Sequence, residues 1–205
     1  MTEIAASPIT VHVIDDDEAL RDSLSWLLEA HGFRVMVHAG AADYLAAAGT
    51  TGSACLLLDV RMPGMSGVQL QDALLQRGDR TPIIFVTGHG DVPMAVEAVK
   101  KGAFDFIEKP FNEEQIVALI RRAVAQDVER RRHAEHDLEH RKHMASLTAR
   151  EREVLDLVVA GKLNKSIADE LGISIKTVET HRARVMEKMQ AKSLAELIQL
   201  TIGER

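Results

Sequence analysis

The first half of the chain carries acidic, basic and hydroxyl side chains that could act together on a phosphoryl group. Asp15 and Asp16 follow one apolar run, Asp59 follows another, and Thr87 and Lys109 stand at the ends of two more. Neighbouring carboxylates repel one another and need a cation, and oxygen ligands in a shallow crevice favour Mg²⁺. A carboxylate beside Mg²⁺ can be the nucleophile in phosphoryl transfer, while a lysine ammonium neutralises the developing charge. These residue types therefore predict a phospho-accepting site, provided that the fold brings them together.

The elements around these residues predict a fold of that kind. Segments with a period of 3.6 residues predict helices at Glu18–Ala30, Ala41–Ala48, Val68–Gln76 and Val92–Lys101, and after Pro110. Short apolar runs predict five β-strands at Ile9–Ile14, Phe33–Val37, Ala54–Leu58, Ile83–Val86 and Phe104–Ile107. This alternation predicts an α/β domain with a five-stranded, doubly wound parallel sheet that is covered on both faces. The carboxyl ends of such strands share one edge of the sheet, where binding crevices lie.

From residue 112 onward the pattern is entirely helical. Residues 112–145 contain no glycine or proline and become strongly charged, which predicts one long connecting helix. Beyond it, several short helices are predicted by the capping boxes Thr148-x-x-Glu151 and Ser193-x-x-Glu196 and by the N-cap candidate Ser174. We therefore predict a first domain at 1–122, a helical linker at 123–145 and a small all-α domain at 146–205.

Charge is distributed unevenly between these segments. Residues 1–122 hold 17 acidic and 10 basic side chains, whereas residues 146–205 hold nine acidic and ten basic ones. An acidic first domain is a poor partner for nucleic acid, so a polyanion should meet the C-terminal third. No apolar run of ~18 residues and no signal-peptide pattern occur, and Cys55 is the only cysteine. We expect a cytoplasmic protein with no membrane partner and a buried thiol at Cys55.

Four blocks of sequence resemble the signature blocks of bacterial response-regulator receivers. They are Val-Ile-Asp-Asp-Asp-Glu (13–18), Leu-Asp-Val-Arg-Met-Pro-Gly-Met-Ser-Gly (58–67), Thr-Gly-His-Gly-Asp-Val-Pro-Met-Ala-Val (87–96) and Gly-Ala-Phe-Asp-Phe-Ile-Glu-Lys-Pro-Phe (102–111). Over essentially its whole length, the chain is similar to the FixJ group of NarL/LuxR-type regulators. The resemblance implies a flavodoxin-like receiver joined by a long helix to a helix-turn-helix domain.

The resemblance also implies how the first domain would be switched. Asp59 matches the phospho-acceptor, which a sensor histidine kinase would phosphorylate. Lys109 matches the phosphate-pairing lysine, Thr87 the switch hydroxyl, and Phe106 the aromatic whose rotamer reports activation. Movement of residues 92–106 would then promote a homodimer.

A magnesium site is the second implication of the resemblance for this domain. Asp16 and Asp59 match direct Mg²⁺ ligands, Asp15 a ligand through water, and Arg61 a ligand through its backbone carbonyl. Asp17, an extra acid, is expected at the solvated start of the first helix. An alternative is a metal-dependent phosphatase or phosphotransferase. It is disfavoured because Arg61, and not a second acid, stands two residues after Asp59, so we expect no enzyme.

Residues 148–202 resemble the four-helix LuxR-type DNA-binding domain. Ser174–Met189 matches the recognition helix, in which Val178, Val185 and Met189 recur at the spacing of a buried stripe. The residues expected to contact DNA are Lys165, Ser174, Lys176, Thr177, Glu179, Thr180, His181, Arg182, Ala183 and Arg184. We expect Lys165, Lys176 and Arg184 to contact phosphates, and Glu179, Thr180 and Ala183 to face base edges.

Together, these features predict a phosphorylation-dependent transcription regulator of a two-component system. Its partners would be the kinase, promoter DNA, RNA polymerase and a second copy of the chain. Dimerisation would double the phosphate contacts that a weakly charged domain can make. A second alternative is a relay or interaction module whose C-terminal helices bind protein or RNA.

One feature lies outside these motifs. His133, His136, His140 and His143 recur every three or four residues and so share one face of the predicted linker helix. We expect a solvated polar stripe. The alternative is a pH-sensitive or transition-metal-binding seam between two such helices.

Overall fold

The computed structural model describes residues 9–47, 53–88 and 92–202. The chain divides into two compact units, Met1–Arg130 and Arg131–Arg205. Ala48, the predicted end of the second helix, lies outside the described residues. Within the described ranges, no helix has both the length and the hydropathy that crossing a membrane requires.

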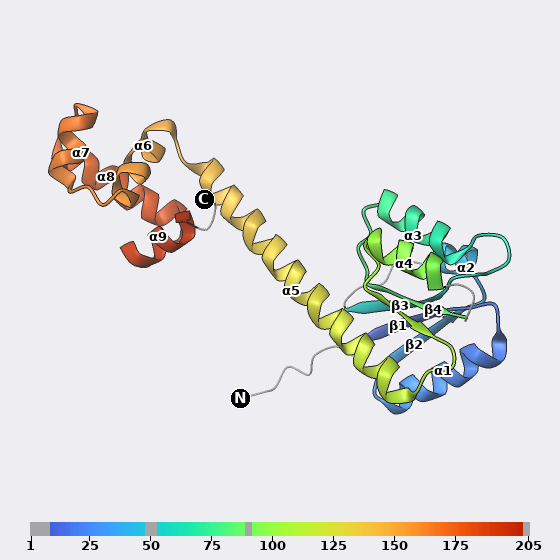
Figure 1. Cartoon of the computed structure of the whole chain (residues 1–205). Helices are drawn as coiled ribbons and strands as arrows, with labels where there is room; N and C mark the ends of the chain where they lie inside the picture. The colour runs from blue at the N-terminus through green and yellow to red at the C-terminus, as the bar shows by residue number, and fades with distance from the viewer. Residues whose placement is uncertain (1–8, 48–52, 89–91, 203–205) are drawn as a thin grey trace. The chain divides into compact units, whose positions relative to one another are not determined.

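A five-stranded parallel sheet forms the centre of the first unit (Figure 1). Its strands are β1 Thr10–Ile14, β2 Arg34–His38, β3 Ala54–Asp59, β4 Ile83–Thr87 and β5 Asp105–Glu108. Their order is β2-β1-β3-β4-β5, and each neighbouring pair is parallel. The predicted fold class and strand positions are therefore confirmed.

Helices cover both faces of this sheet (Figure 1). They are α1 Glu18–Ala30, α2 Ala41–Ala46, α3 Gly67–Gln76, α4 Val92–Lys100 and the start of α5 Glu113–Ser146. Side chains alternate between faces along a strand, so each strand contributes to two cores. Val11 of β1 packs in one core with α1 and α5, whereas Ile14 packs in the other with α3. Cys55 is completely buried, as expected.

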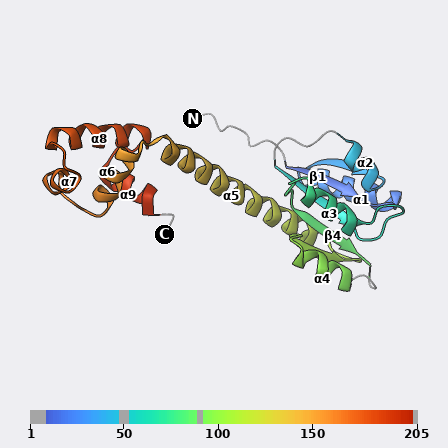
Figure 2. The same ribbon diagram turned by 90° about the horizontal axis from the view of Figure 1, so that it is seen from above.

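Helix α5 runs without interruption from Glu113 to Ser146 (Figure 2). Ala123, Val124 and Asp127 of this helix are buried in the first unit. The first turns of the expected linker therefore pack with the sheet domain. The boundaries at 122/123 and 145/146 stay a prediction.

The second unit is all helical, as predicted. After the end of α5 it contains α6 Ala149–Val159, α7 Asn164–Leu171, α8 Ile175–Lys188 and α9 Leu194–Ile202. Val178, Val185 and Met189 form the expected buried stripe of α8. One histidine of the linker stripe, His140, is buried in this unit, so a fully solvated stripe is wrong for that residue.

All three predicted helix starts in this unit are confirmed, because α6, α8 and α9 begin directly after Thr148, Ser174 and Ser193. Thr148 and Glu151 form a complete capping box, and the Ser174 hydroxyl accepts the Thr177 N–H. At the third, the Ser193 hydroxyl accepts the Glu196 N–H at 3.1 Å. The Glu196 carboxylate, however, accepts the N–H of residue 192 at 2.7 Å and not that of Ser193, so the predicted capping box is wrong in its second half.

Candidate functional site

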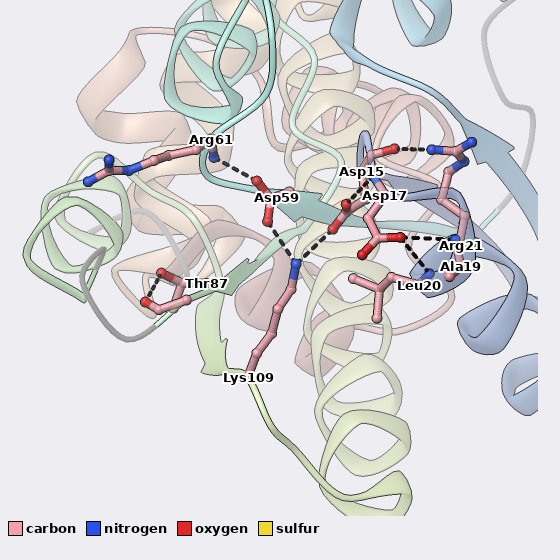
Figure 3. Close-up of polar contacts among 10 residues, drawn as sticks. Asp15, Asp17, Ala19, Leu20, Arg21, Asp59, Arg61, Thr87 and Lys109 are labelled. Atoms are coloured by element: carbon pink, nitrogen blue, oxygen red, sulfur yellow. Dashed lines mark hydrogen bonds and ion pairs between the residues drawn. The ribbon is translucent and has the colours of Figure 1, made fainter.

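The ends of four strands bring the predicted acidic site together at one edge of the sheet (Figure 3). Asp15 directly follows β1, Asp59 ends β3, Thr87 ends β4 and Lys109 directly follows β5. The Lys109 Nζ atom lies 2.9 Å from Asp15 Oδ2 and 3.0 Å from Asp59 Oδ1. One ammonium group therefore bridges two carboxylates that are separated by 44 positions in the sequence.

Backbone groups hold both of these carboxylates in fixed orientations. Asp15 Oδ1 accepts the Asp17 N–H at 2.9 Å, and Asp59 Oδ2 accepts the Arg61 N–H at 2.7 Å. Asp15 is 3% exposed and Asp59 is 9% exposed, so neither carboxylate has much water to stabilise its charge. Hydrogen bonds must replace that water.

The electrostatics of the site follow from this burial. Burial raises the pKa of Asp59 above its ordinary value, although the hydrogen bond from Lys109 opposes the shift. Burial alone would lower the pKa of Lys109, but its hydrogen bonds to Asp15 and Asp59 outweigh that effect and raise it. The ammonium therefore stays charged, and the site contains one fixed positive charge beside a carboxylate that burial makes less acidic.

The remaining predicted residues of this site lie apart from the Lys109 bridge. Asp16 is exposed, whereas Asp15 is buried. The Thr87 side chain is completely buried, and its hydroxyl donates to the Gly88 carbonyl at 3.2 Å. Phe106 is half-buried and packs against the core on the α3 side of the sheet. Asp17 is the N-cap of α1, as expected for the extra acid.

In the second unit, α8 presents most of the predicted DNA-contacting side chains to solvent. The exposed residues are Lys165 of α7 and Ser174, Lys176, Glu179, Thr180, Ala183 and Arg184 on or beside α8. Three others, Thr177, His181 and Arg182, are partly buried. Arg182 donates to Asn164 Oδ1 at 2.7 Å, and the Nδ1 atom of His181 is buried. The exposed side chains are accessible to a polyanion, whereas Arg182 is bonded within its own domain.

Two successive parts of the chain match known protein families. A family model of the response regulator receiver domain matches residues 11–121, and one of the luxR family of bacterial regulatory proteins matches residues 145–201. The transcriptional regulatory protein FixJ of Azorhizobium caulinodans is 48% identical over 194 residues, which span 95% of this chain and 92% of that protein. The chain is a response regulator with a LuxR-type output domain.

Two further relatives agree with this assignment. The C4-dicarboxylate transport transcriptional regulatory protein DctR of Rhodobacter capsulatus is also 48% identical over 194 residues, or 94% of this chain and 98% of that protein. The solved structure of the response regulator StyR has 42% identity and a TM-score of 0.86, and the match covers 96% of this chain and 100% of that one. The response regulator is thus homologous to transcription regulators, a family that is typically non-enzymatic and controlled by phosphorylation.

Receiver domains generally bind Mg²⁺ in this acidic pocket, and the donors of this response regulator fit that ion. Among the described residues, no three histidine, cysteine, aspartate or glutamate side chains converge tightly enough to hold a metal. Mg²⁺, however, keeps several of its waters and is usually bound by only one or two carboxylates. Asp15 and Asp59 supply two, with oxygen as the only donor type.

Sequence reasoning about this response regulator missed Gly67. A Cβ at this position would lie 2.1 Å from the backbone oxygen of Asp59. Only glycine therefore allows the start of α3 to pack directly against the end of β3. The sequence contained a sign of this role, because Gly67 is the last residue of the receiver-like block at 58–67. Its role, however, depends on a close approach that only the tertiary structure defines.

Proposed function

We propose that a sensor histidine kinase phosphorylates Asp59 and that the phosphoryl group promotes homodimerisation and sequence-specific DNA binding by α8. The observation that carries this proposal is the Lys109 ammonium, which contacts both Asp15 and Asp59 at the sheet edge. The protein would act in the cytoplasm, where promoter DNA and RNA polymerase are its further partners. It would accept phosphate once and not turn over phosphomonoesters, because the exposed Arg61 supplies no second acid beside Asp59.

The chemistry at Asp59 follows from its partners. A carboxylate oxygen of Asp59 would attack phosphorus, and the bond from phosphorus to a nitrogen of the donor histidine would break. Lys109 would pair with the phosphoryl oxygens, whose negative charge it is placed to neutralise. Mg²⁺, held by Asp15, Asp16, Asp59 and the Arg61 carbonyl, would supply further charge neutralisation when bound.

Two residues of the same edge would then report the phosphoryl group. Thr87 would exchange its hydrogen bond to the Gly88 carbonyl for one to a phosphoryl oxygen. The movement of Thr87 would open room for the half-buried Phe106 to turn inward. This is a shift between two packings that differ in their affinity for phosphate. The exposed apolar residues Met94 and Val96 of α4 support the expected dimer face.

Binding of DNA would use the exposed side of α8. Lys176 and Arg184, with Lys165 of α7, would contact phosphates and set the register of the helix. Glu179, Thr180 and Ala183 would face base edges in the major groove. Ser174 and Thr177 would flank them at the start of the helix. Because α8 projects only a few base-reading side chains, a dimer with two half-sites would supply the specificity.

The decisive test compares the wild-type chain with Asp59→Asn and, as a matched control, Asp22→Asn on the exposed surface of α1. Each protein is incubated with Mg²⁺ and acetyl phosphate, weighed by intact-mass spectrometry and used in a gel shift over genomic fragments. Wild type and Asp22→Asn should gain one phosphoryl group and bind a subset of fragments more tightly. If Asp59→Asn gains the same mass, or if phosphorylation leaves the gel shift unchanged, the proposal is wrong.

A further inference from the structure

Arg182 lies on the inward side of the proposed recognition helix. It follows Val178 by four residues and precedes Val185 by three, so the three share one face of α8. Val178 and Val185 are fully buried in the core of the second unit. The Arg182 side chain lines a small cavity with Leu155 of α6 and Leu197 of α9. Its aliphatic part is therefore packed inside the domain, in contrast to the exposed Lys176 and Arg184.

The guanidinium of Arg182 has a specific partner in the neighbouring helix. Its Nη1 atom donates to Asn164 Oδ1 at 2.7 Å. Arginine has only donors, so the atom of Asn164 that faces it must be the amide oxygen. Asn164 is the first residue of α7, and its predecessor Leu163 provides no capping side chain. The hydrogen bond therefore joins the start of α7 to the middle of α8.

A second arginine holds the opposite end of α7. Arg150 of α6 donates to the carbonyl of Leu171, the last residue of α7. A cation is favourable at that end of a helix, because the carbonyl groups there carry partial negative charge. The same field opposes a guanidinium at the start of α7, so Arg182 is held there by Asn164 and by packing.

We propose that Arg182 is a positioning residue that fixes α8 relative to α7 through Asn164 and does not itself contact DNA. This inference rests on the proposed DNA binding by α8. The planar guanidinium fixes the direction of its donated hydrogen bond, and packing of the Arg182 side chain against the core limits its other movements. The two helices of a helix-turn-helix must keep a fixed angle, because one crosses the phosphate backbone while the other enters the major groove.

The experiment measures affinity as a function of salt for the full-length chain treated with beryllofluoride. The probes are the genomic duplex retained in the gel shift and a random-sequence duplex of equal length. Arg182→Gln and Asn164→Ala should each weaken binding to the selected duplex by about tenfold. The double variant should be no weaker than Arg182→Gln, because both changes break one contact. Arg182→Lys should recover part of the loss, because lysine keeps one donor.

Two readouts separate positioning from contact. Loss of a phosphate contact lowers the slope of log affinity against log salt by about 0.9 and weakens both duplexes equally. Lys176→Gln should behave in that way. Arg182→Gln should leave the slope within about 0.3 of wild type and change binding to the random duplex less than about twofold, since its effect is on geometry.

The opposite pattern would overturn the inference. A drop of about 0.9 in the slope for Arg182→Gln would mean that Arg182 contacts a phosphate of DNA directly. Wild-type affinity for Asn164→Ala would mean that the hydrogen bond between Arg182 and Asn164 does not position α8. Thermal unfolding is recorded for each variant. If Arg182→Gln unfolds the domain, Asn164→Ala and Arg182→Lys decide the question. Failure of the wild-type chain to bind either duplex would count against the proposed function, whereas the pattern among variants tests Arg182 alone.

Discussion

The charged side chains of the two functional regions of this response regulator differ in their exposure to water. At the sheet edge, Asp15, Asp59 and Lys109 are largely withdrawn from water and bond to one another. On α8, Lys176 and Arg184 point into solvent. A buried charge must be paired within the chain, because removing it from water is costly. An exposed charge is stabilised by water and needs no partner until a phosphate of DNA binds to it. The receiver site is therefore nearly complete within the chain, and the DNA-binding surface is completed only by its partner.

This contrast predicts where substitutions affect folding and where they affect only binding. Changes at the acidic edge should alter stability and phosphorylation together, since the same contacts serve both. Changes on the exposed side of α8 should alter affinity and leave stability unchanged.

The largest effect should come from Gly67→Ala. The added Cβ would lie 2.1 Å from the Asp59 backbone oxygen, so the start of α3 must move away from β3. We expect the free energy of unfolding to fall by about 3 kcal/mol and phosphorylation by acetyl phosphate to slow. Urea unfolding and intact-mass time courses measure the two effects. Gly40→Ala is the matched control, because a Cβ there meets nothing within 4 Å; equal behaviour of the two variants would contradict the prediction.

In the second unit, an ion pair with one buried partner joins Lys188 of α8 to Glu151 of α6. Like the pairs of Lys109, it combines a partly exposed lysine with a buried carboxylate. Lys188→Met would leave the Glu151 carboxylate, which is 2% exposed, without its cation. We expect this unit to lose roughly 2 kcal/mol of stability, because a hydrogen bond to a charged group is removed. Hydrogen exchange of α6 and α8 amides measures the loss. The exposed Lys192→Met should have no such effect, and similar exchange in both variants would show that the pair is not stabilising.

The pH dependence of stability should also differ between the units. Burial, with the neighbouring His38, lowers the pKa of His12 from 6.5 to about 4. The ring is therefore neutral in the folded state, and protonation favours unfolding. The contribution of His12 is fully present above pH ~6.5 and is lost progressively as the pH falls toward 4, by about 2 kcal/mol between pH 6.5 and 5. Urea unfolding of the receiver amides at these two pH values should show this loss, and His12→Leu should reduce it.

The second unit should resist the same change of pH. The hydrogen bond from Lys188, with those from Thr148, lowers the pKa of Glu151 from 4.5 to about 2. Its contribution is present above pH ~4.5 and is lost only as the pH falls from there toward 2. Hydrogen exchange at pH 5 should therefore show a weakened receiver beside an unchanged C-terminal unit. If the receiver and the C-terminal unit lose equal stability at pH 5, the predicted difference in their pH dependence is wrong.

The smallest effect should come from Lys176→Gln on the exposed side of α8. Loss of one phosphate contact should weaken DNA binding for all sequences alike and lower the slope of log affinity against log salt by about 0.9. The stability of the chain should not change, because the Lys176 side chain is exposed. Fluorescence anisotropy and thermal unfolding provide the two measurements, with Lys192→Gln as the control. A Lys176→Gln variant that binds normally would remove this residue from the proposed interface.

Much of the receiver could be predicted because its signals are local. Apolar runs marked each strand to within one residue, and the parallel arrangement then required Asp15, Asp59, Thr87 and Lys109 to share one edge. The prediction did not anticipate which acid of the first pair is buried. Asp15 is enclosed at the strand end, where it accepts hydrogen bonds from the Asp17 N–H and from Lys109, whereas Asp16 lies in the bend that follows and is exposed.

Other features depended on contacts between elements far apart in the sequence. A ring nitrogen of His12 lies 2.9 Å from one of His38, and Tyr44 packs edge-on against both rings. The sequence does not predict this pair. Residue type predicts that Arg182 contacts DNA, but its position on α8 matches the buried stripe and its side chain is partly buried. In both cases packing against a neighbouring element, and not the local sequence pattern, decides the environment of the side chain.

By itself, the sequence determined the order and type of the elements, the strand ends that carry the acidic residues, and the helix starts after Thr148, Ser174 and Ser193. Each of these depends on hydrophobic period or on hydrogen bonds within a few residues, which are the same in any context. Only the tertiary structure decided that Lys109 bridges Asp15 and Asp59, that Gly67 must lack a side chain, and that Arg182 turns toward Asn164. Those outcomes depend on distances between separate elements, and such distances are set by how the whole core packs.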